Sequence, residues 1–260
     1  MIWDVDPVLL HLGPFELRYY SLMFVVGFFS MDLYVKGLFK QHGKDPELVS
    51  SLTTHLVLGM LVGSRLAHCL FYEPDYYLSN PIEILKVWEG GLASHGGYVG
   101  VMVAVWVYLR KHKDLTFLWI MDLIAGPCLF VGGLIRLGNF FNSEILGDPT
   151  SGPLGVIFTR VDQIPRHAVQ LYESMGYFTI AFILMAVARY KFLSWPRGIN
   201  LVIAIILSFT FRFFIEYLKD EQSQMVFTEA INMGQWLSLA FVAGGFVLMA
   251  KVMKKQAHSF

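Results

Sequence analysis

Apolar runs of membrane-spanning length alternate with polar connections along the whole chain. Seven such runs occur in the 260 residues, at 19–39, 51–71, 94–109, 117–135, 170–188, 199–218 and 233–250. A helix needs about 20 apolar residues to cross about 30 Å of hydrocarbon. The third run is short, and its helix could begin in the glycine-containing loop before it. The pattern predicts an all-α integral membrane protein with seven transmembrane helices in one polytopic domain, residues 1–260.

Lys and Arg residues are unevenly distributed between the runs. Twelve lie in the first, third and fifth connections and the carboxyl-terminal tail, six lie on the opposite side, and Arg65 and Arg212 lie within runs. Positive residues near the ends of spans mark the cytoplasmic side. The amino end is therefore predicted outside and the carboxyl end inside.

The fourth connection, residues 137–169, is predicted to form an ordered insertion on the outer side. It contains Pro149, Pro153 and Pro165 and a strand-like run, Val156-Ile157-Phe158. Connections of this length without structure of their own are uncommon. We therefore expect this segment to fold against the outer ends of the helices.

Small residues recur every four positions in the second and third runs. They are Gly59, Gly63 and Ala67 in one and Gly96, Gly100 and Ala104 in the other. Residues four apart share one face of a helix, and small side chains let two helices approach closely. These two faces are therefore expected to pack in helix contacts.

Composition and charge restrict the possible classes of function. The chain is 55% hydrophobic and 15% charged, with a formal net charge of zero. It has no basic block that could bind nucleic acid. Cys69 and Cys128 lie in apolar runs, where packing is the expected role. No cationic segment precedes the first run, so no secretory signal is expected.

A dense group of polar residues follows the fourth apolar run. Arg136, Asn139, Asn142 and Glu144 lie within nine residues at the start of the outer segment. Polar groups in hydrocarbon need partners. A guanidinium beside amide and carboxylate groups suits an anionic phosphate ester. The alternative is a helix end with a snorkelling arginine and capping asparagines.

Further polar residues fall in the outer halves of other runs. Tyr20 and His95 open the first and third runs, and Arg212 and Glu216 lie near the end of the sixth. By the rise of a helix, Arg212 is about 9 Å below the outer end. These residues are expected to converge with Arg136 in the outer leaflet. Alternatively, Arg212 and Glu216 form a buried ion pair that fixes helix contacts.

Other charged groups allow several interpretations. Arg65 lies about 10 Å below the outer end of the second run. It could be a third cation for a headgroup or the partner of an acidic residue. Asp32 and Asp122 lie near inner ends and are expected to bond backbone or serine groups. His95 could act as a base near neutral pH, or it could be a structural residue at a helix start.

Several catalytic classes lack their motifs. The histidines show no metal-ligand spacing, so no zinc site is expected. Neither a Gly-x-Ser-x-Gly elbow nor a P-loop occurs.

The motifs together resemble a known family, the bacterial prolipoprotein diacylglyceryl transferases. Residues 136–147, Arg-Leu-Gly-Asn-Phe-Phe-Asn-Ser-Glu-Ile-Leu-Gly, resemble that family's signature Arg-x-Gly-Asn-Phe-x-Asn-x-Glu-x-x-Gly. Supporting matches lie at residues 63–66, 94–97, 165–167, 170–173 and 212–216. Ile135 and Ser208 depart from residues common in the family, and Ser208 is assigned no role.

The resemblance implies substrates, roles and a location. It implies transfer of the diacylglyceryl group of phosphatidylglycerol to the lipobox cysteine of a prolipoprotein, with no cofactor, in the bacterial cytoplasmic (inner) membrane at the periplasmic leaflet. The implied catalytic residues are His95, Arg136 and Arg212. Substrate binding is assigned to Tyr20, Arg65, Asn139, Asn142, Glu144 and Glu216. The partners are membrane lipids and the prolipoprotein signal peptide, with no nucleic acid.

Two other classes compete with this interpretation. A seven-span transporter or receptor could bind an anionic solute through Arg65, Arg136 and Arg212. A non-catalytic lipid-binding homologue is the third possibility, although every charged residue of the signature is present.

Overall fold

The chain forms two compact units, described in a computed structural model at residues 1–13, 15–87, 91–190, 195–220 and 231–257. The first unit is Met1–Met31 with Asp122–Phe260, and the second is Asp32–Met121. Two helices pass from one unit into the other. They are α1, Tyr19–Gln41, and α5, Phe117–Asn142.

Apart from the short helices α3 and η1, which lie between the second and third runs, the remaining helices follow the predicted apolar runs. They are α2 (Glu47–Phe71), α3 (Pro74–Ser79), α4 (Ser94–Leu109), α6 (Val169–Tyr190), α7 (Ile199–Ile215) and α8 (Met233–Ala257), with the short 3-10 helices η1 (Pro81–Leu85) and η3 (Glu216–Leu218). Six described helices are long and apolar enough to span a membrane, and α4 is shorter. The prediction of an all-α membrane protein is therefore confirmed, whereas the seventh span and the orientation stay predictions.

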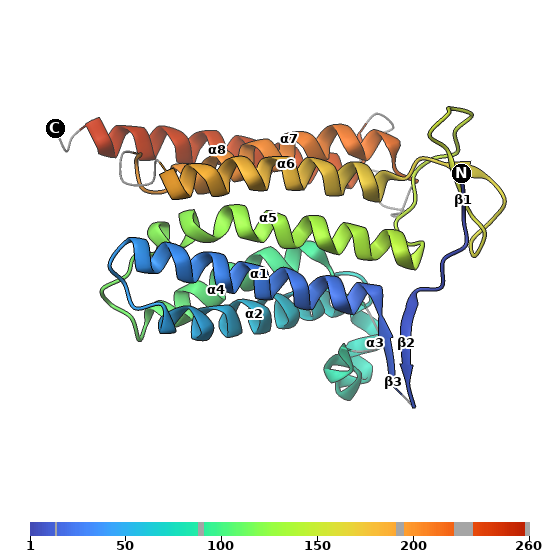
Figure 1. Ribbon diagram of the computed structural model, residues 1–260, viewed down its shortest axis with the longest axis horizontal. Helices are drawn as coiled ribbons and strands as arrows, with labels where there is room; N and C mark the ends of the chain where they lie inside the picture. The colour runs from blue at the N-terminus through green and yellow to red at the C-terminus, as the bar shows by residue number, and fades with distance from the viewer. Residues whose placement is uncertain (14, 88–90, 191–194, 221–230, 258–260) are drawn as a thin grey trace. The chain divides into compact units, whose positions relative to one another are not determined.

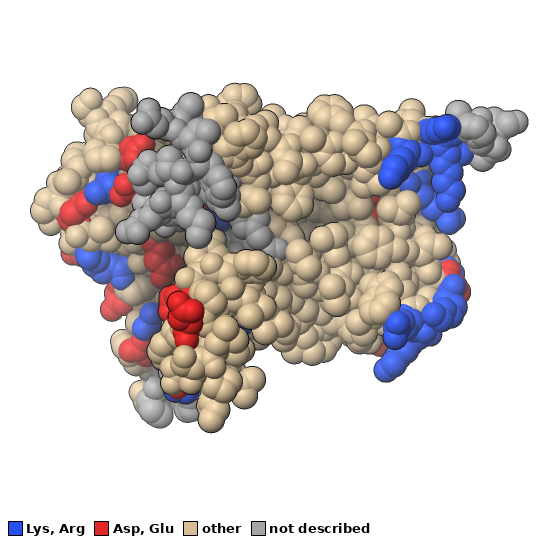
Figure 2. All heavy atoms as spheres, turned by 180° about the vertical axis from the view of Figure 1, so that it is seen from behind, with Lys and Arg blue, Asp and Glu red and all other residues tan. Residues whose placement is uncertain are grey.

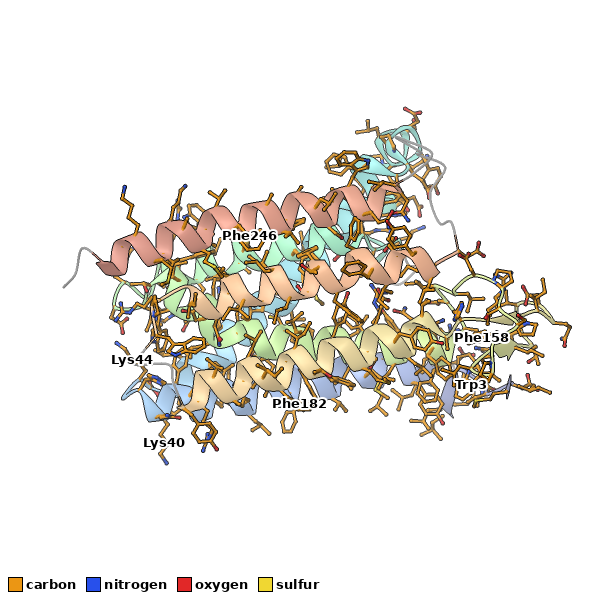
Figure 3. All side chains as sticks on the ribbon, turned by 90° about the horizontal axis from the view of Figure 1, so that it is seen from above. Trp3, Lys40, Lys44, Phe158, Phe182 and Phe246 are labelled. Atoms are coloured by element: carbon orange, nitrogen blue, oxygen red, sulfur yellow. The ribbon has the colours of Figure 1, made fainter. Side chains whose placement is uncertain are left out.

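Four helices of the first unit run side by side, α5, α6, α7 and α8 (Figure 1). Ala125, Ile180, Leu184 and Ala204 form a buried apolar cluster between α5, α6 and α7. Phe182 points away from the helices in Figure 3 and is 56% exposed. Apolar side chains on the outside and in the core are both expected of helices surrounded by lipid.

A buried carboxylate near the start of α5 binds the start of α7. Asp122 of α5 accepts hydrogen bonds from the backbone N–H groups of Gly198, at 2.5 Å, and Leu201, at 3.0 Å. It thereby caps the first turn of α7, whose N–H groups have no partner within the helix. In the second unit Asp32 accepts a hydrogen bond from Thr53 at 3.0 Å and pairs with Lys36 at 2.7 Å. The backbone role predicted for Asp122 is confirmed.

Short strands lie near the amino terminus and in the connection between α5 and α6. They are β1 (Ile2–Trp3), β2 (Val8–Leu12), β3 (Phe15–Arg18), β4 (Val156–Phe158) and β5 (Pro165–Arg166). β1 pairs in parallel with β4, β4 pairs antiparallel with β5, and β2 and β3 form a separate hairpin. The strand-like run 156–158 is confirmed. The amino-terminal strands were not predicted, because two to five residues give little periodicity.

Helix α5 extends beyond the apolar run predicted at 117–135. It continues to Asn142 and ends at Ser143, whose φ is +55°, so the first residues of the connection expected from residue 137 are helical. The last turn is kept because Phe140 is buried against Leu146, Val156 and Phe158. Trp3 packs on the same cluster, with its ring centroid 4.2 Å from that of Phe140. Most of the signature therefore lies on a helix rather than in a loop.

In the second unit, α2 and α4 approach each other closely through their glycines. A Cβ atom added to Gly63 would collide with the carbonyl oxygen of Gly96, and one added to Gly100 with that of Gly59. The predicted packing of these small-residue faces is confirmed.

Replacing Gly100 by alanine is expected to destabilise the second unit by about 1–3 kcal/mol, because the backbones must separate to admit a methyl group. Gly37→Ala is the matched control, since a Cβ there meets nothing within 4 Å. Thermal unfolding in detergent measures both. Equal midpoints for the two variants would contradict the close approach.

Candidate active site

A buried carboxylate joins two cations at one end of the first unit. Glu173 of α6 has no exposed surface. It forms an ion pair with Arg136 of α5, with 3.0 Å between Nε of Arg136 and Oε2 of Glu173. Its other oxygen lies 2.8 Å from Nζ of Lys219, which follows η3. Breaking such a pair leaves an uncompensated buried charge. Three segments of the chain are therefore held together by one ionised group.

Two more charged residues complete this group. Glu216 lies 3.4 Å from Lys219 and is largely buried. Arg212, one turn before Glu216 on α7, interacts electrostatically with both Glu173 and Lys219. We call these residues the ionic cluster: Arg136, Glu173, Arg212, Glu216 and Lys219.

Close backbone contacts position the members that follow α7. Lys219 forms an isolated β-bridge with Gly147 of the signature. A Cβ atom on Gly147 would lie 2.6 Å from the carbonyl oxygens of His167 and Leu218, so only glycine fits there. The Glu216 carboxylate similarly lies against Gly234 at the start of α8, where an added Cβ would be 2.5 Å from Oε1.

The polar residues of the signature form a network beside the cluster. Arg136 donates a hydrogen bond to Oδ1 of Asn139 at 3.3 Å. The amides of Asn139 and Asn142 donate to the two carboxylate oxygens of Glu144, at 3.3 and 3.2 Å. Ser143 and Ile145, on either side of Glu144, have positive φ angles of 55° and 57°. Such conformations are uncommon outside glycine, and here they turn Glu144 back toward the helix end.

Tyr20 reaches this network from α1. Its ring lies over Gly138, where an added Cβ would be 2.7 Å from Cδ2 of the tyrosine. The Tyr20 hydroxyl also interacts electrostatically with Glu144 and Arg136. The first unit therefore brings together the predicted site residues Tyr20, Arg136, Asn139, Asn142, Glu144, Arg212 and Glu216.

Two arginines hold the connection between α5 and α6 against this group. Arg166 bonds Asp162 through two nitrogens, at 2.9 and 2.8 Å, and Asp220 through a third, at 3.0 Å. The hydrogen bond from Arg166 holds the pKa of Asp162 below its usual range. Arg160 donates to the Phe141 carbonyl at 2.7 Å and to the Ser143 hydroxyl at 2.9 Å. These contacts fix the turn that carries Glu144.

The other two predicted site residues belong to the second unit. Arg65 is 3% exposed and donates to the carbonyl oxygens of Ile84, at 3.0 Å, and Glu83, at 2.5 Å. Its guanidinium also lies 5.0 Å from the ring centroid of Tyr77. These contacts hold η1 and α3 against α2, so Arg65 has a structural role here. His95 is the second residue of α4, and its side chain lies outside the described residues.

Three buried residues received no role from the sequence: Glu173 and Lys219 of the ionic cluster, and Gln170, which donates a hydrogen bond to the Glu144 carbonyl at 2.7 Å. Gln170 and Glu173 lie in one of the matched motifs, and Lys219 was counted only as an outer cation. A usable signal existed, because a carboxylate and an amide one turn apart in an apolar run need buried partners. Which cation Glu173 pairs with depends on helix packing alone.

Among the residues that the structure describes, no three His, Cys, Asp or Glu side chains form a group that could hold a metal ion.

Charged side chains are concentrated near helix ends, and the sides of the helices are largely uncharged. In Figure 2 the described sides of the helices are largely tan, and the visible Lys, Arg, Asp and Glu side chains lie near helix ends. The fold and the site define a helical membrane protein with a buried ionic cluster at one end of its helices.

Comparison with known proteins identifies the family. The model of the family "Prolipoprotein diacylglyceryl transferase" matches residues 7–251. The chain is 44% identical over 258 residues to a phosphatidylglycerol–prolipoprotein diacylglyceryl transferase of Tolumonas auensis, covering 99% of this chain and 100% of the relative. A protein of the same name from Chloroherpeton thalassium is 42% identical, covering 98% and 95%. One from Bacteroides fragilis is 36% identical, covering 98% and 96%. The chain belongs to the prolipoprotein diacylglyceryl transferase family.

Family membership confirms the resemblance found in the motifs. It also gives no support to the transporter or receptor alternative.

Proposed function

We propose that this chain transfers the diacylglyceryl group of phosphatidylglycerol to the lipobox cysteine of prolipoproteins. The family and the names of the relatives support the substrates. The observation that carries the chemistry is the ionic cluster, in which fully buried Glu173 holds Arg136 at 3.0 Å and Lys219 at 2.8 Å. Cations fixed in a buried site suit a phosphate on which charge develops.

The charge balance of the ionic cluster supports an anionic ligand. Its members are three cations and two carboxylates, so one positive charge remains. A phosphodiester carries one negative charge and would neutralise it. Glu144 is exposed, so water screens its carboxylate more effectively than a buried charge.

In the proposed reaction the cysteine sulfur attacks the carbon of the diacylated glycerol that is bonded to the phosphate oxygen. The C–S bond forms and the C–O bond breaks, and its electron pair stays on the phosphate oxygen of the departing glycerol phosphate. Arg136 and Arg212 hold that phosphate through the transition state. Lys219 adds a third positive charge, and Glu173 keeps Arg136 and Lys219 in place before the lipid binds. Preorganised charges need no rearrangement at the moment of reaction.

The lipid headgroup also needs contacts outside the phosphate. Asn139, Asn142 and Glu144 orient Arg136 or bind the headgroup hydroxyls, and Tyr20 binds the lipid ester or headgroup. Glu216 holds Lys219, at 3.4 Å. Arg65, which binds backbone carbonyls, would act on substrate only through the position of η1.

The thiol proton requires an acceptor. A free cysteine thiol has a pKa of about 8.5, so only a small fraction is thiolate at neutral pH. His95 is the proposed base. An imidazole in general titrates near neutral pH and can take a proton from sulfur.

Replacing His95 by asparagine is expected to lower kcat about 10²-fold, the lower end of the usual effect of general base catalysis. The rate is measured with purified enzyme between pH 6 and pH 9. The variant should recover part of the loss at high pH, where more thiolate forms without a base. An unchanged rate at neutral pH would assign the proton to a carboxylate or to water.

We also propose seven spans with the amino end outside, one polytopic domain, and a site facing the periplasmic leaflet of the bacterial inner membrane. The distribution of Lys and Arg supports this orientation. In the first unit, the ionic cluster lies at the carboxyl-terminal ends of α5 and α7 and the start of α6. Lys254 and Lys255 occupy the last turn of α8. Labelling of single cysteines from each side of intact membranes tests the orientation.

The activity itself is tested in detergent with phosphatidylglycerol labelled in its acyl chains and a lipobox peptide. The expected result is a labelled peptide with a thioether bond and an equal amount of glycerol phosphate. A peptide with serine in place of the lipobox cysteine is the control and should remain unlabelled. A folded enzyme that forms no thioether would overturn the proposal.

A further inference from the structure

Gln170 is a fully buried amide on α6 whose nitrogen has a hydrogen-bond partner and whose oxygen has none among the described residues. Its Nε2 donates to the backbone carbonyl of Glu144 at 2.7 Å. Its Oε1 is buried and has no hydrogen-bond partner among the described residues. The donor contact fixes the orientation of the amide, because only the nitrogen can donate to a carbonyl. Buried polar atoms are nearly always paired, so an unpaired acceptor needs an explanation.

The surroundings of Gln170 point to a ligand. Contacts link Arg136 to Asn139, Asn139 to Glu144, and Glu144 to Gln170, and Arg136 also pairs with Glu173. Gln170 and Glu173 are one turn apart on α6 and share one face of that helix. The unpaired acceptor therefore lies within one turn of the carboxylate that holds the phosphate-binding cations.

We infer that Oε1 of Gln170 accepts a hydrogen bond from a hydroxyl group of the headgroup glycerol. The inference rests on the proposed function. It makes Gln170 a specificity-determining residue, which distinguishes phosphatidylglycerol from phospholipids whose headgroup alcohol has no second hydroxyl. The cations cannot make this distinction, since every phosphodiester offers them the same charge. A site that hydrogen-bonds a substrate hydroxyl discriminates against the analogue that lacks it.

The test compares phosphatidylglycerol with phosphatidylethanol, which keeps the phosphodiester but has no headgroup hydroxyl. Gln170→Met preserves side-chain length and removes both the acceptor and the donor to the Glu144 carbonyl. The lost donor should lower kcat/KM for both lipids by the same factor. The lost acceptor should lower kcat/KM for phosphatidylglycerol by a further factor of about 3 to 10, the range of one hydrogen bond. The preference for phosphatidylglycerol therefore shrinks, whereas a purely structural role would lower both rates equally and overturn the inference.

Asn200 provides a matched control in the same unit. It is 2% exposed, its amide donates to the carbonyls of Asp122 and Leu184 at 3.2 Å, and its Oδ1 is also buried without a hydrogen-bond partner. It lies twelve residues before Arg212 on α7, about 18 Å along the helix. Asn200→Leu is expected to lower stability and leave the ratio of the two lipids unchanged. An equal change of the ratio in both variants would overturn the inference.

A second measurement needs no variant. Glycerol 1-phosphate and ethyl phosphate are compared as inhibitors of the wild-type enzyme. Both present a phosphate, but only glycerol 1-phosphate has free hydroxyl groups on its alcohol. Glycerol 1-phosphate should inhibit at about 3- to 10-fold lower concentration. Equal inhibition would overturn the hydroxyl contact while leaving the transfer reaction itself intact, since that is measured independently by thioether formation.

Discussion

Replacing Arg136 by alanine is expected to lower kcat/KM for phosphatidylglycerol about 10³-fold, the upper range for one donor to a developing oxyanion. The guanidinium pairs with Glu173 at 3.0 Å and contacts Asn139 at 3.3 Å. Its loss removes a cation from the proposed phosphate site. It also removes one of the two cations that pair with the buried Glu173 carboxylate, so the remaining cations are held less firmly. Initial rates of thioether formation in detergent, corrected for the amount of folded enzyme, measure the effect.

Two further variants separate charge from geometry. Arg136→Lys keeps the charge but cannot bond a carboxylate and an amide in one plane, so a loss of at least about tenfold is expected. Arg212→Ala should resemble Arg136→Ala. Arg18, whose side chain is 53% exposed beside Glu16, is the control position, and Arg18→Ala should retain full activity. An Arg136→Ala enzyme within tenfold of wild type would show that this arginine does not hold the phosphate.

Replacing Glu173 by glutamine is expected to destabilise the first unit by about 3–5 kcal/mol, because buried cations lose their shared counter-ion. Glutamine has nearly the same shape, so the effect reports charge rather than packing. Arg136 and Lys219 should then repel each other, and transfer should fall with stability. Unfolding followed by tryptophan fluorescence in detergent, together with the yield of folded protein from membranes, measures the loss.

A double variant makes this prediction specific. In Glu173→Gln with Lys219→Met, one anion and one cation are removed together, so the double variant should be more stable than the sum of the single effects implies. Asp162→Asn, which breaks an ion pair near the surface, is the matched control and should change stability by less than about 1 kcal/mol. Additive effects of the two cluster substitutions would argue against a shared buried pair.

The sequence predicted the helices well because their periodic signal is long. Six apolar runs coincide with helices of spanning length, and the third run coincides with α4, which is shorter. The end of α5 was misplaced because the polar residues after Ile135 resemble a loop. The last turn of α5 is retained because Phe140 is buried against Leu146, Val156, Phe158 and Ala168, which follow α5. Local composition cannot reveal that burial.

The site was predicted in part. The signature gave Arg136, Asn139, Asn142 and Glu144, which the structure joins in one network. The structure pairs Glu216 with Lys219 at 3.4 Å, and the alternative ion pair of Glu216 with Arg212 stays a prediction. The convergence of His95 with these residues stays a prediction.

The sequence by itself determined that this is a helical membrane protein of the prolipoprotein diacylglyceryl transferase family, because hydrophobic length and a long motif are local properties of the chain. Only the tertiary structure decided which charges are partners. Glu173, Arg136 and Lys219 come from three segments, and their pairing depends on the packing of α5, α6 and the residues after α7. Buried ions must find partners within about 4 Å, and distances that short between distant parts of the chain are set by the fold.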